Sequence, residues 1–268
     1  MMVLKDDIQL AGGCLQTCTG IRSGIEAAIH ATSTSWNLEL TECLLQVDAD
    51  NAFNRLNRKV ALHNIKELCP SVATFLFNHY QSAAPLFVND NLQQETFYSE
   101  EGCTQGDPSA MQFYALGVKP LINILAENVN TDLCKQAWYA DDSSAVGKLT
   151  AVKTWWQKLN SAGPKFGYFP KASKSILILK DESLLSEARD LFAECNIQIT
   201  CQGERHLGAV IGHNSFKKEY VSEKVSKWIK DITELANISM EEPQAAYSAY
   251  TKSIYATDGF LYKGLYRV

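Results

Sequence analysis

The chain has 268 residues, 46% of them apolar, and a formal net charge of −5. This length and composition can bury a full core in one large domain or two closely packed ones, which excludes disordered and fibrous proteins. No stretch approaches the roughly 20 apolar residues of a membrane span, and the first residues lack the pattern of a secretory signal, so we expect an intracellular protein with no membrane partner. The eight cysteines show no paired CxxC spacing, and we expect reduced, buried thiols.

The first part of the sequence leads to a single acid. A short helix is expected over 25–32, and an apolar strand over 43–48 runs into Asp48. A polar, helix-prone stretch follows, so Asp48 is expected at the carboxyl end of the strand. Asp50 is a second candidate ligand, with a solvent-facing helix N-cap as the alternative. Apolar residues at helical spacing then predict helices over 57–68 and 71–80.

The middle of the chain predicts a hairpin, a glycine-containing loop and a long helix. Two strands, 85–91 and 96–99, flank an Asn-Asp-Asn turn. In the loop at 101–108, Gly102 and Gly106 let the backbone approach a ligand closely. Pro108 suits the first turn of a helix over 109–128, whose N-terminus offers unpaired amides to a phosphate or a template.

Two adjacent acids, Asp141 and Asp142, lie at the expected turn between strands at 136–139 and 143–147. Successive strand residues point to opposite faces, so only one of the two easily faces a shared centre, and a partner carboxylate is needed. Asp48 supplies it. Acids from separate strands can hold two Mg²⁺ ions about 3.5–4 Å apart, the arrangement used for nucleotidyl transfer.

After this hairpin we expect a helix with two adjacent tryptophans and a series of shorter elements. Trp155 and Trp156 face different directions, which predicts one core side chain and one half-exposed side chain. His206 is expected to be a structural hydrogen-bonding residue. The predicted elements are a helix at 149–161, a strand at 175–180, a helix at 187–194, a strand at 197–201, a strand with a glycine bend at 205–212, and a largely helical stretch at 220–268.

Three segments together resemble the reverse transcriptase family, specifically its retroelement type, non-LTR or related. They are VDADNAFN at 47–54, GCTQGDP at 102–108 and YADD at 139–142. The resemblance extends from about residue 10 to 255 and implies an α/β (α+β) polymerase palm, with an antiparallel sheet backed by helices. By this likeness, residues 1–40 are partial fingers and the connection to the palm, 41–212 are the palm, and 213–268 begin a truncated thumb. The family's Arg-rich segment that grips the triphosphate has no counterpart here, so we expect an N-terminally truncated form.

The resemblance also implies a role for each matching residue. Asp48 and Asp141 would be the main ligands of two Mg²⁺ ions, with Mn²⁺ as a substitute, and Asp142 would support them. Phe53 would exclude a ribose 2′-hydroxyl; its alternative role is that of a core aromatic. Lys174 would protonate the departing pyrophosphate, with a solvated lysine as the alternative. The nucleotide or template contacts would be Ala49, Gln105 and Gly106, with Asp107 structural, and the primer contacts Leu207 and Gly208.

The implied function is RNA-directed DNA polymerase activity on an RNA or DNA template with a primer and deoxynucleoside triphosphates, alongside other retroelement domains. The acidic balance argues against strong nucleic-acid binding. It is offset by lysines in the second half: Lys171, Lys174, Lys217, Lys218, Lys224, Lys227 and Lys230. Two alternatives remain: an inactive retroelement-derived palm fragment with at most weak nucleic-acid binding, and an RNA-dependent RNA polymerase, which Phe53 disfavours.

Overall fold

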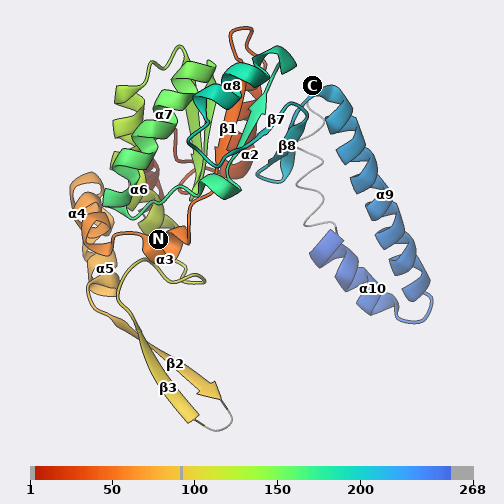
Figure 1. Ribbon diagram of the computed structural model, residues 1–268. Helices are drawn as coiled ribbons and strands as arrows, with labels where there is room; N and C mark the ends of the chain where they lie inside the picture. Colours follow the sequence, from red (N-terminus) through yellow and green to blue (C-terminus); the bar gives the residue numbers. More distant parts are fainter. Residues whose placement is uncertain (1–3, 91–92, 255–268) are drawn as a thin grey trace.

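A five-stranded sheet forms the centre of the protein in the computed structural model, which describes residues 4–90 and 93–254 (Figure 1). Its strand order is β4-β5-β1-β6-β7. The strands are β1 (Cys43–Val47), β4 (Cys134–Tyr139), β5 (Asp142–Gly147), β6 (Ile176–Leu179) and β7 (Gln198–Thr200). Every neighbouring pair is antiparallel except β6–β7, which is parallel. The expected α/β fold is therefore present. Its sheet is antiparallel as expected, except for the parallel β6–β7 pair at one edge.

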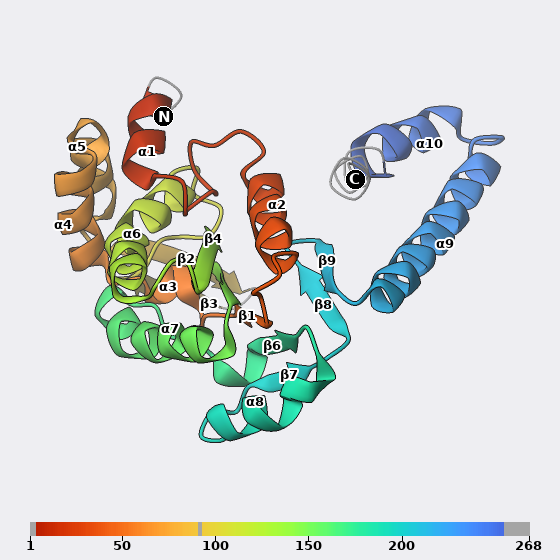
Figure 2. The same cartoon turned by 90° about the horizontal axis from the view of Figure 1, so that it is seen from above.

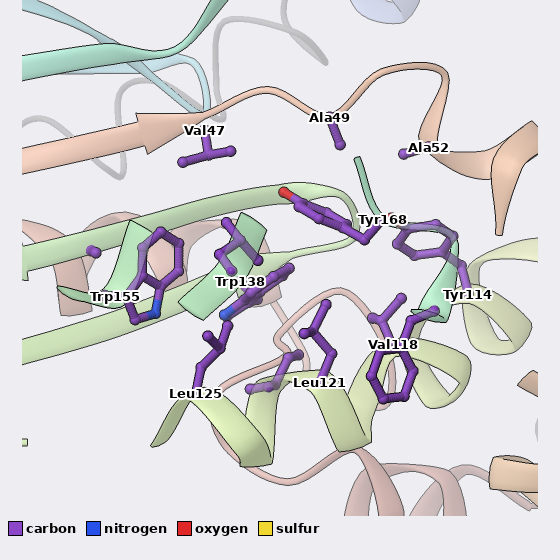
Figure 3. Close-up of a cluster of buried hydrophobic side chains, with 14 of the residues drawn as sticks. Val47, Ala49, Ala52, Tyr114, Val118, Leu121, Leu125, Trp138, Trp155 and Tyr168 are labelled. Atoms are coloured by element: carbon purple, nitrogen blue, oxygen red, sulfur yellow. The ribbon is translucent and has the colours of Figure 1, made fainter. Parts of the chain in front are cut away.

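Alternating residues of the central strand β1 pack into two separate layers. Cys43, Leu45 and Val47 join the main core, which also takes in the helices α6 (Ala110–Asn128) and α7 (Leu149–Ala162). Figure 3 shows part of this core, where Trp138 and Trp155 lie beside Leu121 and Leu125. Leu44 points the other way and packs in a smaller cluster with Trp36, at the end of α2 (Gly24–Trp36). The period-2 pattern of the strand thus covers both faces of the sheet.

Two helices and a long hairpin extend from one side of this body. The helices α4 (Arg58–Leu68) and α5 (Pro70–Tyr80) pack on each other, and α4 packs on α6. The hairpin of β2 (Ala84–Asp90) and β3 (Gln93–Ser99) projects from them (Figure 1). Short helices complete the side and the beginning of the chain: α1 (Lys5–Gly12), which the sequence pattern did not predict, and α3 (Ala52–Arg55).

The C-terminal part leaves the sheet through a second hairpin. Strands β8 (Gly203–His206) and β9 (Ala209–Gly212) lie against α2, and α9 (Asn214–Ile238) with α10 (Pro243–Ala249) extends away from the sheet (Figure 2). A short α8 (Leu185–Leu191) precedes them, and a helical turn over Tyr250–Ile254 follows. The helical prediction for 220–268 therefore starts six residues late, and its last part lies outside the described residues.

Three sequence expectations have clear outcomes here. The prediction that one tryptophan of α7 is half exposed is wrong, because the exposed fractions of Trp155 and Trp156 are 1% and 4%. The sheet and α6 cover one side of α7 while α8 also contacts it, so neither ring reaches solvent. All eight cysteines are free thiols, but the expectation that they are buried is wrong for half of them, because Cys14 is exposed and Cys18, Cys195 and Cys201 are partly exposed. Within the described ranges, no helix is both long and apolar enough to cross a membrane.

Candidate nucleotidyl-transfer site

The turn between β4 and β5 carries two of the acids in a constrained backbone. Tyr139 and Asp142 are cross-strand partners, which leaves Ala140 and Asp141 as the two turn residues. Ala140 has φ +55°, in the left-handed region that alanine rarely occupies. Such a conformation costs roughly 1–3 kcal/mol for a residue other than glycine and persists only where neighbouring contacts enforce it.

Those contacts come from a distant segment of the chain and from a buried tyrosine. The side-chain amide of Gln16 donates to the carbonyl of Ala140 at 3.0 Å and accepts from its N–H at 2.9 Å. Tyr168 Oη donates to the carbonyl of Asp141 at 2.8 Å and also bonds Ser143 Oγ at 2.9 Å. Figure 3 shows Tyr168 in the core beside Tyr114. The acid turn is therefore held from both sides.

Asp48 reaches the same place from the end of β1. The last pair of the β1–β5 ladder is Val47 with Ser143, so one further step in the same register sets Asp48 opposite Asp142. The carbonyl of Asp48 also accepts from the N–H of Lys171 at 2.8 Å, which fixes the backbone after the strand. The fold thus brings Asp48, which follows β1, close to Asp141 and Asp142 at the β4–β5 turn.

The electrostatics of these acids reflect their crowding. Burial raises the pKa of Asp141, and the negative charge of Asp48 raises it further against a lowering backbone hydrogen bond. Burial around its carboxyl and the charges of Asp141 and Asp48 raise the pKa of Asp142 to about 6, although this side chain keeps contact with solvent. No salt bridge to these three acids occurs in the described part of the chain.

Uncompensated carboxylates of this kind are the oxygen ligands that Mg²⁺ takes in proteins, so the donor chemistry fits the expected ion. The described residues nevertheless contain no group of three or more His, Cys, Asp and Glu side chains already arranged to hold a metal. The Mg²⁺ and Mn²⁺ assignment therefore stays a proposal. With Asp48 and Asp141 as the main ligands, Asp142 or the phosphates of the substrate would have to complete the coordination of the ions.

Asp50 is occupied differently. Its carboxylate forms salt bridges with Arg55 at 2.6 Å and Lys171 at 3.1 Å, and hydrogen bonds from Lys171 and Arg55 lower its pKa. It is not an N-cap, because Asn51 occupies that position before α3. Both cations compete with any ion for this carboxylate, which makes Asp50 a poor ligand.

The aromatic and small residues after Asp48 lie beside the acids with different exposure. Phe53 is partly buried and stacks on the ring of Tyr114, with ring centroids 4.5 Å apart. Ala49 is buried, with an exposed fraction of 7%, and bridges Pro170. Of the two, only Phe53 presents a side chain that a nucleotide can touch.

The loop before α6 presents the other expected nucleotide contacts. Gln105 and Gly106 are exposed, and Gly106 has φ +92° with open space where a Cβ would lie. Asp107 is structural, as expected. Its carboxylate accepts from Tyr80 Oη, from His79 Nε2 at 2.7 Å, and from the N–H and Oγ of Ser109 at 2.8 Å each. Burial alone would raise its pKa, but these hydrogen bonds lower the pKa to about 2.

The last expected contacts lie on two further segments. Lys174 is exposed in a short helical turn, and no salt bridge of its side chain is found among the described residues. In the same loop, Lys171 forms a salt bridge with Asp50. Leu207 and Gly208 form the tip of the β8–β9 hairpin, with φ +50° and +89°. His206 Nε2 bonds Thr32 Oγ1 of α2 at 3.2 Å, which agrees with its expected structural role.

Sequence reasoning missed two residues that hold the site together. One is Gln16, to which the sequence pattern assigned no role. The other is Arg58, which is 5% exposed and donates to the carbonyls of Ser99, Glu101 and Gly102. It therefore ties the base of the β2–β3 hairpin to the loop that carries Gln105. Neither residue has a local sequence signal, because each acts through partners more than 20 positions away.

Comparison with known proteins identifies the fold. No protein-family model matches the chain, and no curated protein matches it in sequence. Apo telomerase from Candida tropicalis matches 79% of the chain with a TM-score of 0.56 and 13% identity, over 38% of its own length. The form of that enzyme truncated from the C-terminal domain matches 66% of the chain with a TM-score of 0.54 and 14% identity, over 39% of its length.

Telomerase from Candida albicans, solved in complex with a TWJ fragment of telomeric RNA, matches 65% of the chain with a TM-score of 0.50 and 11% identity, over 34% of its length. The chain spans about two-fifths or less of these proteins. At such identities the likeness shows the fold alone. It is the α/β palm-type fold of reverse-transcriptase-related polymerases, as the sequence resemblance implied.

Proposed function

We propose that the chain is the palm region of a retroelement RNA-directed DNA polymerase, which adds deoxynucleotides to a primer 3′-hydroxyl. One observation carries the proposal: on a reverse-transcriptase-like fold, Asp48 and the Asp141–Asp142 turn meet at one edge of the sheet. The proposed division is partial fingers at 1–40, palm at 41–212, and the start of the thumb at 213–268.

Asp48 and Asp141 would hold the metal ions, with Asp142 in support. When bound, two Mg²⁺ ions supply activation of the attacking hydroxyl and neutralisation of charge on the leaving pyrophosphate. The protein's part is positioning. Gln16 and Tyr168 fix the turn that carries Asp141 and Asp142. The hydrogen bond from the N–H of Lys171 to the carbonyl of Asp48 fixes the backbone at Asp48.

The remaining roles surround this centre. Phe53 would select the deoxyribose, Gln105 and Gly106 would contact the nucleotide or template, and Ala49 would contribute its backbone. Lys174 would act as a mobile general acid, and Leu207 with Gly208 would meet the primer terminus. The telomerase of Candida albicans, solved with an RNA fragment, supports nucleic acid as the partner class.

The second candidate is an inactive palm fragment that binds nucleic acid weakly. The net charge of −5 favours it, because an acidic domain gains no long-range attraction for a phosphate backbone. The closeness of Asp48 to the supported turn that carries Asp141 and Asp142 favours the polymerase instead.

The deciding experiment is primer extension on an RNA template with deoxynucleotides and Mg²⁺ or Mn²⁺. Wild type is compared with Asp141→Ala and with Asp132→Ala, which removes an exposed acid from a turn away from the site. Extension by wild type and Asp132→Ala but not by Asp141→Ala supports the polymerase. Extension that survives in Asp141→Ala contradicts the proposed site, and no extension by any protein with native circular dichroism favours the inactive fragment.

A further inference from the structure

A groove of about 650 Å³ lies between α4 and α5, on the side of the body from which the β2–β3 hairpin projects (Figure 1). Its α4 wall carries Lys59, His63 and Lys66, at positions i, i+4 and i+7 of one helix face. The opposite wall, on α5, includes Phe77 and Gln81 one turn apart. One wall is therefore basic and the other carries an aromatic ring.

The charge of this groove is opposite to that of the whole chain. No acidic residue lines it, and neither Lys59 nor Lys66 forms a salt bridge among the described residues, whereas the chain has a net charge of −5. Seven residues of helix separate the two lysines by about 10 Å along the axis. Phe77 faces them with half of its side chain exposed. The groove is thus suited to a thin anionic chain with flat apolar groups.

One end of the groove adjoins the candidate site. Arg58, next to Lys59, donates to the carbonyl of Ser82, next to Gln81, and also to the carbonyl of Gly102. Through Arg58, the end formed by Lys59 and Gln81 is therefore linked to Gly102, in the loop that also carries Gln105 and Gly106. From there the groove runs outward along α4 to Lys66.

We propose that this groove binds a short single-stranded segment of nucleic acid, with phosphates on Lys59 and Lys66 and a base stacked on Phe77. Lysines that neutralise phosphates and an aromatic side chain that stacks a base are the two components of sequence-independent single-strand sites. The choice of ligand rests on the proposed function, because a polymerase has an unpaired template strand beside its nucleotide site. The groove itself takes no part in the chemistry.

Fluorescence anisotropy with labelled oligouridylate tests the proposal. Lys59→Glu with Lys66→Glu should lower affinity at least tenfold and make the slope of log affinity against log salt shallower by about 1.4, from about 0.7 for each of two phosphate contacts. The matched control is Lys158→Glu with Lys165→Glu, two exposed lysines elsewhere with the same change in charge. Phe77→Ala should lower affinity about tenfold. Phe75→Ala should not, because Phe75 is equally exposed on α5 but does not line the groove.

Equal effects of the groove and control lysine pairs, or of the two phenylalanine variants, would overturn the proposal. Primer extension measured on the same groove and control variants separates this proposal from the proposed function. Groove-dependent binding by a protein that extends no primer leaves the groove assignment standing and defeats the polymerase proposal. Normal primer extension together with oligouridylate binding that the groove substitutions do not change would support the polymerase proposal and overturn the groove assignment.

Discussion

Gln16 holds Ala140 through both of its backbone hydrogen-bonding groups, as a peptide unit of a neighbouring strand would. The residues beside Gln16 extend this pairing, because Trp138 donates to the carbonyl of Leu15 and accepts from the N–H of Thr17. A short parallel segment therefore borders β4 next to the acid turn. The left-handed Ala140 lies between Tyr139 and Asp141, so Gln16 positions an acid that it does not touch.

Replacing Gln16 with alanine should destabilise the fold and reduce activity together. The change leaves the N–H and C=O of Ala140 without partners in a fully buried place, at about 1–3 kcal/mol for each group. We expect a loss of about 3 kcal/mol in urea denaturation and a large loss of primer extension at temperatures where the variant is folded. Gln157→Ala, on the exposed face of α7, is the control. Equal stability of the two variants would show that the amide bridge contributes little.

Mg²⁺ should stabilise the protein through the three acids. Wild type is expected to melt at a higher temperature with Mg²⁺ than with a chelator. At a Mg²⁺ concentration a hundredfold above the dissociation constant, the free energy of unfolding should rise by about 2.7 kcal/mol. Asp48→Asn and Asp141→Asn should lose this gain. With the chelator they should be at least as stable as wild type, because each removes repulsion within the cluster. The control is Asp132→Asn, and a Mg²⁺ gain that persists in Asp141→Asn would exclude the assigned ligands.

Arg58 should be a major contributor to the stability of the β2–β3 hairpin and its base. Arg58→Met removes hydrogen bonds to the carbonyls of Ser99, Glu101 and Gly102 at a buried position. We expect a loss of about 3 kcal/mol or more, together with faster proteolysis of the β2–β3 hairpin. Arg189→Met, at an exposed position of α8, should be neutral. A hairpin that keeps its resistance to protease in Arg58→Met would show that other contacts anchor it.

The elements with strong local signals were predictable. An apolar run before Asp48 predicted β1, and two short strands around adjacent acids predicted the β4–β5 hairpin. The predicted bounds of α4 to α7 agree with the structure within one or two residues. The palm-type fold was accessible because several motifs occur in one order. The gathering of Asp48 with Asp141 and Asp142 also followed, since both segments end at the same edge of one sheet.

Features that depend on long-range packing were not predictable. One of Trp155 and Trp156 was expected to be half exposed because α7 alone gives no sign of the further elements that cover it. Nothing near Gln16 indicates that its amide substitutes for a peptide unit 124 residues away. Lys171, rather than Lys174, reaches an acid because the chain after Tyr168 runs antiparallel to the residues following Asp48. The roles assigned to individual site residues stay predictions until they are measured.

His206 should make the stability of the protein depend on pH. Burial lowers its pKa from 6.5 to about 4, so the folded state binds its proton less readily than the unfolded chain does. The stability it contributes is complete above pH 6.5 and falls as the pH drops toward 4, by up to about 1.4 kcal/mol per pH unit. Urea midpoints at pH 7 and pH 5 should differ less for His206→Gln than for wild type or for the exposed control His30→Gln. Equal pH dependence in the three proteins would mean that folding leaves the pKa of His206 unchanged.

We predict that Phe53 selects deoxynucleotides over ribonucleotides. Its ring is stacked on Tyr114 and stays partly exposed beside the acids, so it can both pack in the core and contact a sugar. In Phe53→Ala we expect a loss of about 2 kcal/mol in stability and at least a tenfold rise in ribonucleotide relative to deoxynucleotide incorporation. Phe97→Ala, on the exposed β2–β3 hairpin, should change neither. A loss of stability with unchanged sugar selection would assign Phe53 to the core alone. Efficient ribonucleotide use by wild type would instead favour an RNA polymerase, because the larger side chain would then be failing to exclude the 2′-hydroxyl.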